Sequence, residues 1–182
     1  MSKVEPPGAA FRVVSLDPEI NRSDFRCGTD SLDRYFQSQV TQDMRRRVTA
    51  CFVALDDENQ IAGYYTLASA SVLLRDLPEI IVKKLPRYPT VPAVRMGRLA
   101  VAHVCKGKGF GAALLADALA RSARAEIAAH ALIVDALDEV AAKFYAHHGF
   151  AGFPENTLAL FLPFATVLNS LAGSLAYPAE QP

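Results

Sequence analysis

The sequence lacks the features of several large protein classes. Its three cysteines, Cys27, Cys51 and Cys105, are odd in number and widely spaced and form no CxxC pair, which disfavours a disulfide framework. No segment offers about 18 uninterrupted apolar residues, and two prolines precede the first apolar run, so neither a membrane span nor a secretory leader is expected. We therefore expect a cytoplasmic protein with reduced thiols and no membrane partner.

The sequence also lacks an excess of positive or negative charge. Lysine and arginine total 19 and aspartate and glutamate total 19, so the formal net charge is zero. A protein that coats nucleic acid through its overall field needs an excess of positive charge. Local basic clusters are not excluded by this balance and have to be considered one by one.

What is present describes one globular domain. A chain of 182 residues, 51% of them hydrophobic, can bury roughly two thirds of its unfolded surface in a single core. It therefore needs neither disulfides nor a metal in order to fold. Residues 1–10 are expected to form a loose, flexible arm before the first strand.

The first half of the chain predicts an antiparallel meander. A strand is expected at 11–16, then one helix from Thr29 or Ser31 to the arginines at 45–47, then a hairpin of 50–55 and 61–67 around a polar turn. Residues 69–92 contain four prolines and predict a strand end, a short helix at 79–84 and a loop.

The second half alternates strands and helices. Strands are expected at 93–101, 131–137 and 158–163, with helices at 110–124 and 139–148 and a short apolar helix at 167–175. Strand, helix, strand in this order predicts a βαβ unit with parallel neighbouring strands. The class is therefore mixed α/β (α+β).

A glycine-alternating turn, Lys106-Gly-Lys-Gly-Phe-Gly111, lies between a strand and a helix. Glycines 107, 109 and 111 are expected to adopt positive φ and to let the backbone approach a ligand. Exposed N–H groups and the positive end of the following helix suit a pyrophosphate. The alternative is a tight strand-to-helix connection. The spacing fits neither a Walker loop nor the dinucleotide fingerprint.

A second motif is the helix that carries Phe144 and Tyr145. Phe144 would pack on the sheet and Tyr145 would lie about 100° around the axis, with its hydroxyl toward a cleft. The alternative is a half-buried tyrosine whose hydroxyl is in water.

Together these residues resemble the GCN5-related N-acetyltransferase (GNAT) superfamily. The loop at 106–111, Ala141, Tyr145 and Gly149-Phe150 follow its pattern, with Lys106 in place of Gln or Arg and Asp138 where Asn is common. The resemblance implies the GNAT fold: a mixed central sheet with an antiparallel N-terminal meander and a splayed parallel strand pair that holds acetyl-CoA. The acetyltransferase domain would span 11–164, followed by a C-terminal extension at 165–182.

A narrower resemblance is to the acetyltransferase toxins of bacterial toxin–antitoxin pairs. It is carried by Phe25-x-Cys-Gly-x-x-x-Leu32-Asp33-x-Tyr35, the arginines 45–47, Gly63-Tyr-Tyr-Thr-Leu67, Arg87-Tyr-Pro89, Gly97-Arg-Leu-Ala-Val101 and Leu160-Phe-Leu-Pro163. This family acetylates the α-amine of charged tRNA and blocks translation. It implies a ribbon-helix-helix antitoxin and a homodimer as partners.

The resemblance also implies a site. The residues that would bind acetyl-CoA are Leu99, Ala100, Val101, Lys106, Gly107, Lys108, Gly109, Phe110, Gly111, Ala112, Asp138 and Phe144. Tyr145 would be the catalytic residue that protonates the departing thiolate. No carboxylate stands out as a general base, and no metal is expected.

For an RNA acceptor the sequence offers three basic clusters. They are Arg45, Arg46 and Arg47; Lys83, Lys84 and Arg87; and Arg95 with Arg98. Each cluster taken alone is also typical of a solvated face or a helix end. The resemblance favours the arginines 45–47 and Arg87 as parts of a phosphate-contacting surface.

Two other functions stay open at this point. One is an acetyltransferase for a protein N-terminus or a small amine, although a polyamine acceptor should call for an acidic pocket and only the turn at 56–58 is acidic. The other is a non-catalytic acetyl-CoA-binding module, which the glycines of the loop and Tyr145 disfavour.

Overall fold

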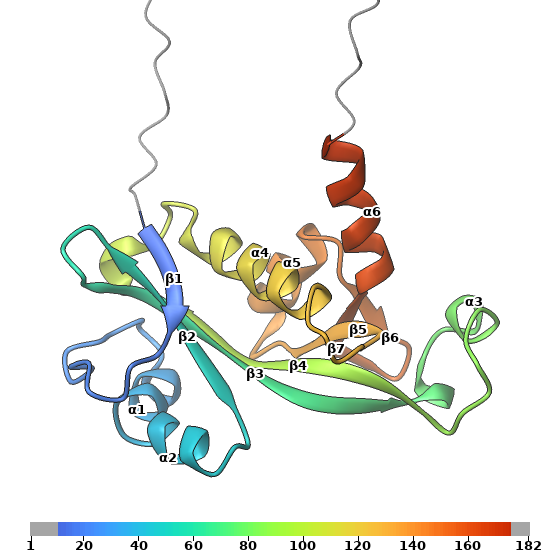
Figure 1. Ribbon diagram of the computed structural model, residues 1–182, viewed down its shortest axis with the longest axis horizontal. Coiled ribbons are helices and arrows are strands. Elements are labelled where there is room, and N and C mark those ends of the chain that lie inside the picture. Colours follow the sequence, from blue (N-terminus) through green and yellow to red (C-terminus); the bar gives the residue numbers. More distant parts are fainter. Residues whose placement is uncertain (1–10, 176–182) are drawn as a thin grey trace, which may run out of the picture. The chain divides into compact units, whose positions relative to one another are not determined.

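The computed structural model describes residues 11–175 and contains one seven-stranded mixed sheet (Figure 1). The strand order is β1-β2-β3-β4-β5-β7-β6. The predicted arm at 1–10 and residues 176–182 of the predicted extension lie outside the described residues. The mixed α/β class is confirmed.

The elements have the following bounds. The strands are β1 (Phe11–Ser15), β2 (Ala50–Asp56), β3 (Ile61–Leu73), β4 (Thr90–Val101), β5 (Ala131–Asp135), β6 (Ala151–Phe153) and β7 (Asn156–Pro163). The α-helices are α1 (Asp30–Ser38), α2 (Val40–Arg45), α3 (Glu79–Val82), α4 (Phe110–Ala123), α5 (Glu139–His147) and α6 (Phe164–Leu175). Two short 3₁₀ helices are η1 (Leu74–Asp76) and η2 (His103–Cys105).

The chain divides into two compact units. The first comprises Met1–Thr66 with Arg98–Leu114, and the second comprises Leu67–Gly97 with Leu115–Pro182. The long strands β3 and β4 and the helix α4 each contribute residues to both units. None of the helices within residues 11–175 is long and apolar enough to cross a bilayer.

The first unit is built on the antiparallel pair β1–β2 and an aromatic core. Phe11 pairs with Asp56 and Ser15 with Phe52, which confirms the start of the predicted meander. Helices α1 and α2 lie beside these strands (Figure 1). In the core, Phe36 of α1 packs on Tyr64 of β3, and the two rings stack with centroids 4.1 Å apart. Aromatic pairs of this kind add about 0.5–1.5 kcal/mol beyond their burial.

The prediction of one continuous helix up to the arginines 45–47 was wrong, because the chain forms two helices. Gln39 (φ −115°) ends α1 and begins α2. Its N–H donates to the Tyr35 carbonyl, and its own carbonyl accepts from Gln42 N–H at 3.0 Å. The Tyr35 hydroxyl also donates to Asp43 at 3.0 Å and ties the two helices together across the break.

The second unit contains the parallel pair. Its register runs from Ala93 opposite Ala131 to Met96 opposite Val134, as the strand–helix–strand order predicted. The pair is shorter than either strand, since β4 continues to Val101. On its other edge β5 pairs with β7 in antiparallel fashion. The short strand β6, which the sequence pattern did not predict, pairs with β7 around a bulge.

The proline-rich segment is more regular than predicted. β3 extends to Leu73 and β4 begins at Thr90, so only 74–89 departs from strand geometry. Pro92 lies inside β4, where its carbonyl accepts from the His130 N–H at 2.8 Å and its missing N–H leaves the next pair at Ala93 undisturbed. Helix α6 begins at Phe164 rather than 167, and Phe164 is held there by burial of its ring and by its N–H, which donates to the His130 carbonyl at 2.9 Å.

Gly63 in β3 allows three elements of the first unit to pack closely. A Cβ at this position would lie 2.7 Å from the Ala100 carbonyl oxygen of β4 and 2.7 Å from a methyl carbon of Leu114 in α4. Real Cβ atoms do not approach a backbone oxygen this closely, so the strand or the helix would have to move. The glycine therefore fixes the spacing between β3 and the strand and helix that flank the predicted phosphate loop.

We predict that Gly63→Ala lowers the free energy of unfolding by about 1–3 kcal/mol, the usual cost of overpacking a core. Urea denaturation of the purified protein measures this change. Gly152→Ala is the matched control, since Gly152 lies in β6 and a Cβ there would meet nothing within 4 Å. The overpacking explanation fails if the two variants unfold at the same urea concentration.

Candidate active site

The first half of the predicted site is the connection from β4 to α4. After Val101 the chain forms η2, whose first residue, His103, donates its N–H to the Arg26 carbonyl at 2.8 Å. The loop then turns through Gly107 (φ +74°) and Gly109 (φ +85°). The prediction of positive φ is confirmed for these two glycines and wrong for Gly111, which lies inside the first turn of α4 and needs no special φ.

Close packing does not explain the glycines at 107 and 109. A Cβ at Gly107 or Gly109 would meet nothing within 4 Å, so their left-handed backbone is what requires glycine. Both residues are exposed, as are Lys106 and Lys108 beside them. The N–H groups at the start of α4 and the positive end of its dipole make this loop suitable for an anion such as a pyrophosphate.

The side chain of Phe110 has a different role from its neighbours. It is 4% exposed and packs against Phe11 of β1, with ring centroids 5.0 Å apart. Its ring anchors the beginning of α4 to the first unit. A ligand can therefore contact only the backbone of Phe110. Ala112, two positions further along α4, is exposed to solvent.

Gly28 supports this loop and was missed as a site residue, although it belongs to the quoted Phe25-x-Cys-Gly motif. It has φ +92°, and a Cβ built on it would lie 3.5 Å from the Lys106 ammonium and 3.8 Å from His103. The turn at Gly28 is therefore in contact with the first residue of the phosphate loop. The signal in the sequence was a glycine placed between an aromatic residue and a helix start.

The predicted substrate-binding strand residues alternate in burial. Ala100 is 5% exposed, while Leu99 and Val101 are half-buried. Directly after them the Ala102 N–H donates to the Ala62 carbonyl of β3 at 2.8 Å. This bond holds the end of β4 against its neighbour in the first unit.

The second half of the predicted site is α5, in the second unit. Asp138 is the N-cap of this helix, and its carboxylate accepts from the Ala141 N–H at 2.8 Å. The helix ends at His147, and Gly149 (φ +93°) then turns the chain so that the Phe150 N–H donates to the Tyr145 carbonyl at 3.1 Å. These two ends explain physically why Asp138 and the Gly149-Phe150 pair stand at their distances from Tyr145.

Tyr145 is buried in an aromatic environment. It is 7% exposed, and its ring lies between Phe144 and Phe150, with centroid distances of 5.4 and 5.5 Å. Burial raises the pKa of Tyr145 to about 12, because the ionised phenolate would lose its hydration. The hydroxyl makes no hydrogen bond to any residue in the range 11–175, so it is a neutral donor without an internal acceptor.

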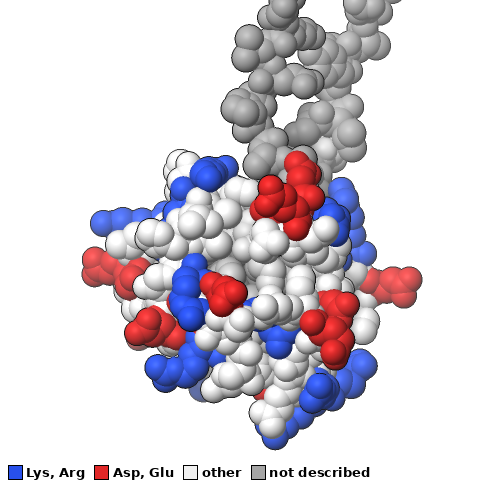
Figure 2. Space-filling view, turned by 90° about the vertical axis from the view of Figure 1, so that its left-hand side faces the viewer, with Lys and Arg blue, Asp and Glu red and all other residues white. Residues whose placement is uncertain are grey.

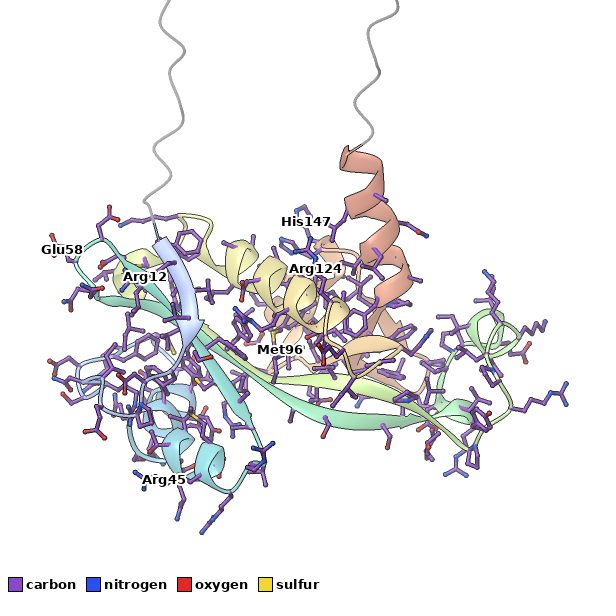
Figure 3. All side chains as sticks on the ribbon, in the orientation of Figure 1. Arg12, Arg45, Glu58, Met96, Arg124 and His147 are labelled. Carbon is purple, nitrogen blue, oxygen red and sulfur yellow. The ribbon has the colours of Figure 1, made fainter. Side chains whose placement is uncertain are left out.

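Phe144, predicted to contact the cofactor, is half-buried and interacts within its own helix. Its ring lies 4.5 Å from that of His148, and its carbonyl is 2.8 Å from His148 Nδ1. His147 follows Phe144 by three positions and is exposed at the C-terminal end of α5 (Figure 3).

The predicted RNA-contacting residues fall into two groups. Those with exposed side chains are Arg45, Arg46, Arg47, Lys83, Lys84 and Arg87. Figure 3 shows Arg45 on the outer side of α2. The half-buried Arg95 and Arg98 already have partners within the chain: Arg95 forms an ion pair with Asp135, and the Arg98 guanidinium lies over the Tyr35 ring, 3.3 Å from its centroid.

Basic and acidic side chains are interspersed over the face of the molecule in Figure 2. This agrees with the balanced composition. Among residues 11–175, no group of three or more His, Cys, Asp or Glu side chains is placed to hold a metal ion. Cys27, Cys51 and Cys105 are free thiols, and burial raises the pKa of Cys51 to about 12.

The order of these elements defines a class of enzyme. An acetyl-CoA-dependent N-acetyltransferase has this order of elements: a strand that leads through a glycine loop into a helix, here α4, then a parallel strand, here β5, and a tyrosine on the next helix, here α5. A sequence profile for the acetyltransferase (GNAT) domain matches residues 47–151, more than half of the chain. The chain belongs to the GNAT family of acetyltransferases.

Individual relatives are similar over much of their length. The chain is 35% identical over 140 residues to the tRNA-acetylating toxin of Mycobacterium tuberculosis, and the match covers 76% of this chain and 82% of that protein. A solved structure of AtaT complexed with acetyl-methionyl-tRNAfMet has a TM-score of 0.82 and 30% identity, over 89% of this chain and 99% of that chain.

A tyrosine-to-phenylalanine variant of the toxin AtaT, solved with the C-terminus of its antitoxin AtaR and acetyl-CoA, is also similar. Its TM-score is 0.75 at 26% identity, and the match covers 88% of this chain and 98% of that chain. The similarity of these neighbours extends over the whole described fold rather than over the glycine loop alone.

We predict that Gly109→Ala weakens acetyl-CoA binding about 5- to 30-fold. A left-handed conformation costs a residue with a Cβ roughly 1–2 kcal/mol, so the loop would relax away from its binding geometry. Titration calorimetry with acetyl-CoA measures the Kd. Asn59→Ala, at φ +60° in the β2–β3 turn, carries the same kind of strain outside the loop and should leave the Kd unchanged.

Proposed function

We propose that this protein is a toxin that transfers the acetyl group of acetyl-CoA to the α-amine of an aminoacyl-tRNA and so blocks translation. The observation that carries the proposal is the likeness, over 89% of the chain, to AtaT complexed with acetyl-methionyl-tRNAfMet. The relative from Mycobacterium tuberculosis is also named as a tRNA-acetylating toxin. The exposed, left-handed glycines of the loop and the buried, neutral tyrosine of α5 fit this chemistry.

In this proposal the substrate acetyl-CoA is held mainly by backbone groups. The N–H groups from Gly107 to Ala112 would bind its pyrophosphate, with Lys106 and Lys108 adding charge, and the backbone of Leu99 to Val101 would hold the amides of the pantetheine arm. Oδ1 of Asp138 accepts a hydrogen bond at the start of α5. A carboxylate has a second acceptor oxygen, which would be available to the pantetheine arm.

The amine nitrogen of the acceptor would attack the thioester carbon, and the carbon–sulfur bond would break. The amine loses one proton to solvent, and the thiolate of CoA gains one. We assign the donation at sulfur to the Tyr145 hydroxyl, which is protonated at cellular pH and which has no competing acceptor within residues 11–175. No separate base is required, since an α-amine with a reference pKa of about 8 is partly neutral at cellular pH.

The partners follow from the same likeness. An antitoxin would bind and neutralise the enzyme, as the structure of AtaT with the C-terminus of AtaR suggests for that pair. The ribbon-helix-helix type of this antitoxin and a homodimeric enzyme remain predictions from the resemblance, and a cytoplasmic location remains a prediction from the cysteine pattern and the N-terminal sequence. The boundary of the acetyltransferase domain at residue 164 also remains a prediction from the resemblance.

We predict that Tyr145→Phe lowers kcat about 100-fold or more and leaves the Kd for acetyl-CoA unchanged. The ring and its packing remain, and only the proton donor is lost. The assay mixes purified protein, acetyl-CoA and total charged tRNA, and mass spectrometry after nuclease digestion identifies the N-acetylated aminoacyl-adenosine. Equal thermal unfolding temperatures show that both proteins are folded.

The outcome also separates the competing activities. Product formed by the wild type and lost in the variant supports the proposal and identifies the amino acid. Acetyl-CoA binding without any acetylated tRNA would reject it and direct the search to protein N-termini and small amines.

We predict a pH profile with a rising limb only. Activity should increase as the acceptor ammonium loses its proton near pH ~8 and then stay level to pH ~10, because Tyr145, with a pKa of about 12, remains protonated over this range. Initial rates in short incubations between pH ~6 and ~10 test this. A descending limb centred below pH ~10 would show that the pKa of Tyr145 is not raised as far as its burial indicates.

A further inference from the structure

Between β3 and β4 the second unit presents a short segment, 74–89, in which an aromatic side chain stands among basic ones. Tyr88 is 68% exposed, and its neighbours Lys83, Lys84 and Arg87 are exposed as well. Basic side chains outnumber acidic ones in this segment. Figure 1 shows α3 and its flanking turns at the ends of β3 and β4, beyond the strands.

The backbone holds Tyr88 in a defined position. The Tyr88 N–H donates to the Pro86 carbonyl at 2.8 Å, and the Pro89 carbonyl accepts from the Leu74 N–H at 3.0 Å. Pro86 and Pro89 fix their own φ angles, and Pro89 also restricts Tyr88 to extended conformations. An exposed ring on a backbone that is fixed in this way loses little entropy when it binds a flat ligand.

We propose that Tyr88 is a stacking platform for an unpaired base of the RNA acceptor, with the surrounding lysines and Arg87 contacting the adjacent phosphates. This inference rests on the proposed function and adds a residue that discriminates single-stranded from paired RNA. Aromatic rings combined with basic side chains are the general means of holding single-stranded nucleic acid, since every base has a face on which to stack. Lys83 is only weakly engaged by Glu79, at 4.0 Å, and can turn to a phosphate.

Because the chain contains no tryptophan, Tyr88→Trp introduces a single indole reporter at this position. Titration of this variant with total deacylated tRNA should quench its indole fluorescence through base stacking. Ile127→Trp is the control, because Ile127 is 87% exposed in the α4–β5 connection and lies outside the proposed surface. The expected result is quenching in the Tyr88→Trp variant and unchanged fluorescence in the Ile127→Trp variant.

Binding measurements complete the test. Tyr88→Ala should raise the Kd for tRNA about 5- to 150-fold, while Tyr88→Phe retains the wild-type value. The salt dependence of the Kd separates the phosphate contacts from the stacking. Arg87→Ala removes one phosphate contact and should reduce the slope of log Kd against log salt by about 1, whereas Tyr88→Ala should leave that slope unchanged.

Two failures are distinguishable. Wild-type protein that acetylates charged tRNA, together with a Tyr88→Ala variant of unchanged tRNA affinity, would overturn the stacking role and leave the proposed function intact; such a result would point to a protein partner for this surface. Wild-type protein that neither binds nor acetylates tRNA would overturn both.

Discussion

The close packing of β3, β4 and α4 at Gly63 is the constraint on which the first unit depends. With no Cβ at Gly63, the Ala100 carbonyl and the Leu114 side chain can both approach this strand, and the strand, loop and helix keep one fixed geometry. The loop itself is exposed and has few contacts of its own. Its shape is therefore determined by the rigid elements at its two ends, with the turn at Gly28 in contact with Lys106.

The loop and Tyr145, the two predicted parts of the site, lie in different units and have different surroundings. The loop has to be open, since its backbone N–H groups must exchange water for phosphate oxygens. The ring of Tyr145 is instead buried, and this burial raises the pKa of its hydroxyl to about 12. The caps of α5 place this ring: Asp138 fixes where the helix begins, and Gly149 follows its end so that Phe150 can pack on the tyrosine ring.

Sequence patterns predicted the parts of this fold that follow from local rules. The glycine loop, the parallel pair and α5 could be predicted because spacing and periodicity specify them. The break at Gln39 could not, because it is formed by backbone bonds that no residue type requires. The extension of β3 and β4 was missed because Pro92 is tolerated inside a strand at a position where no N–H is needed. Gly28 was missed as a site residue because its partner Lys106 is distant in sequence.

The basic residues show why composition alone says little about RNA binding. Arg95 and Arg98 are conspicuous in the sequence, yet one is paired with Asp135 and the other lies over Tyr35, so releasing either would cost an existing interaction. The exposed side chains of the arginines at 45–47 and of Arg87 form no ion pair or ring contact with residues 11–175, so they carry no such cost. With a net charge of zero the long-range attraction is weak, and screening limits each cluster to about 8 Å at physiological salt. Recognition of an RNA must then come from short-range contacts, and an exposed ring such as that of Tyr88 is suited to make them with little loss of side-chain freedom.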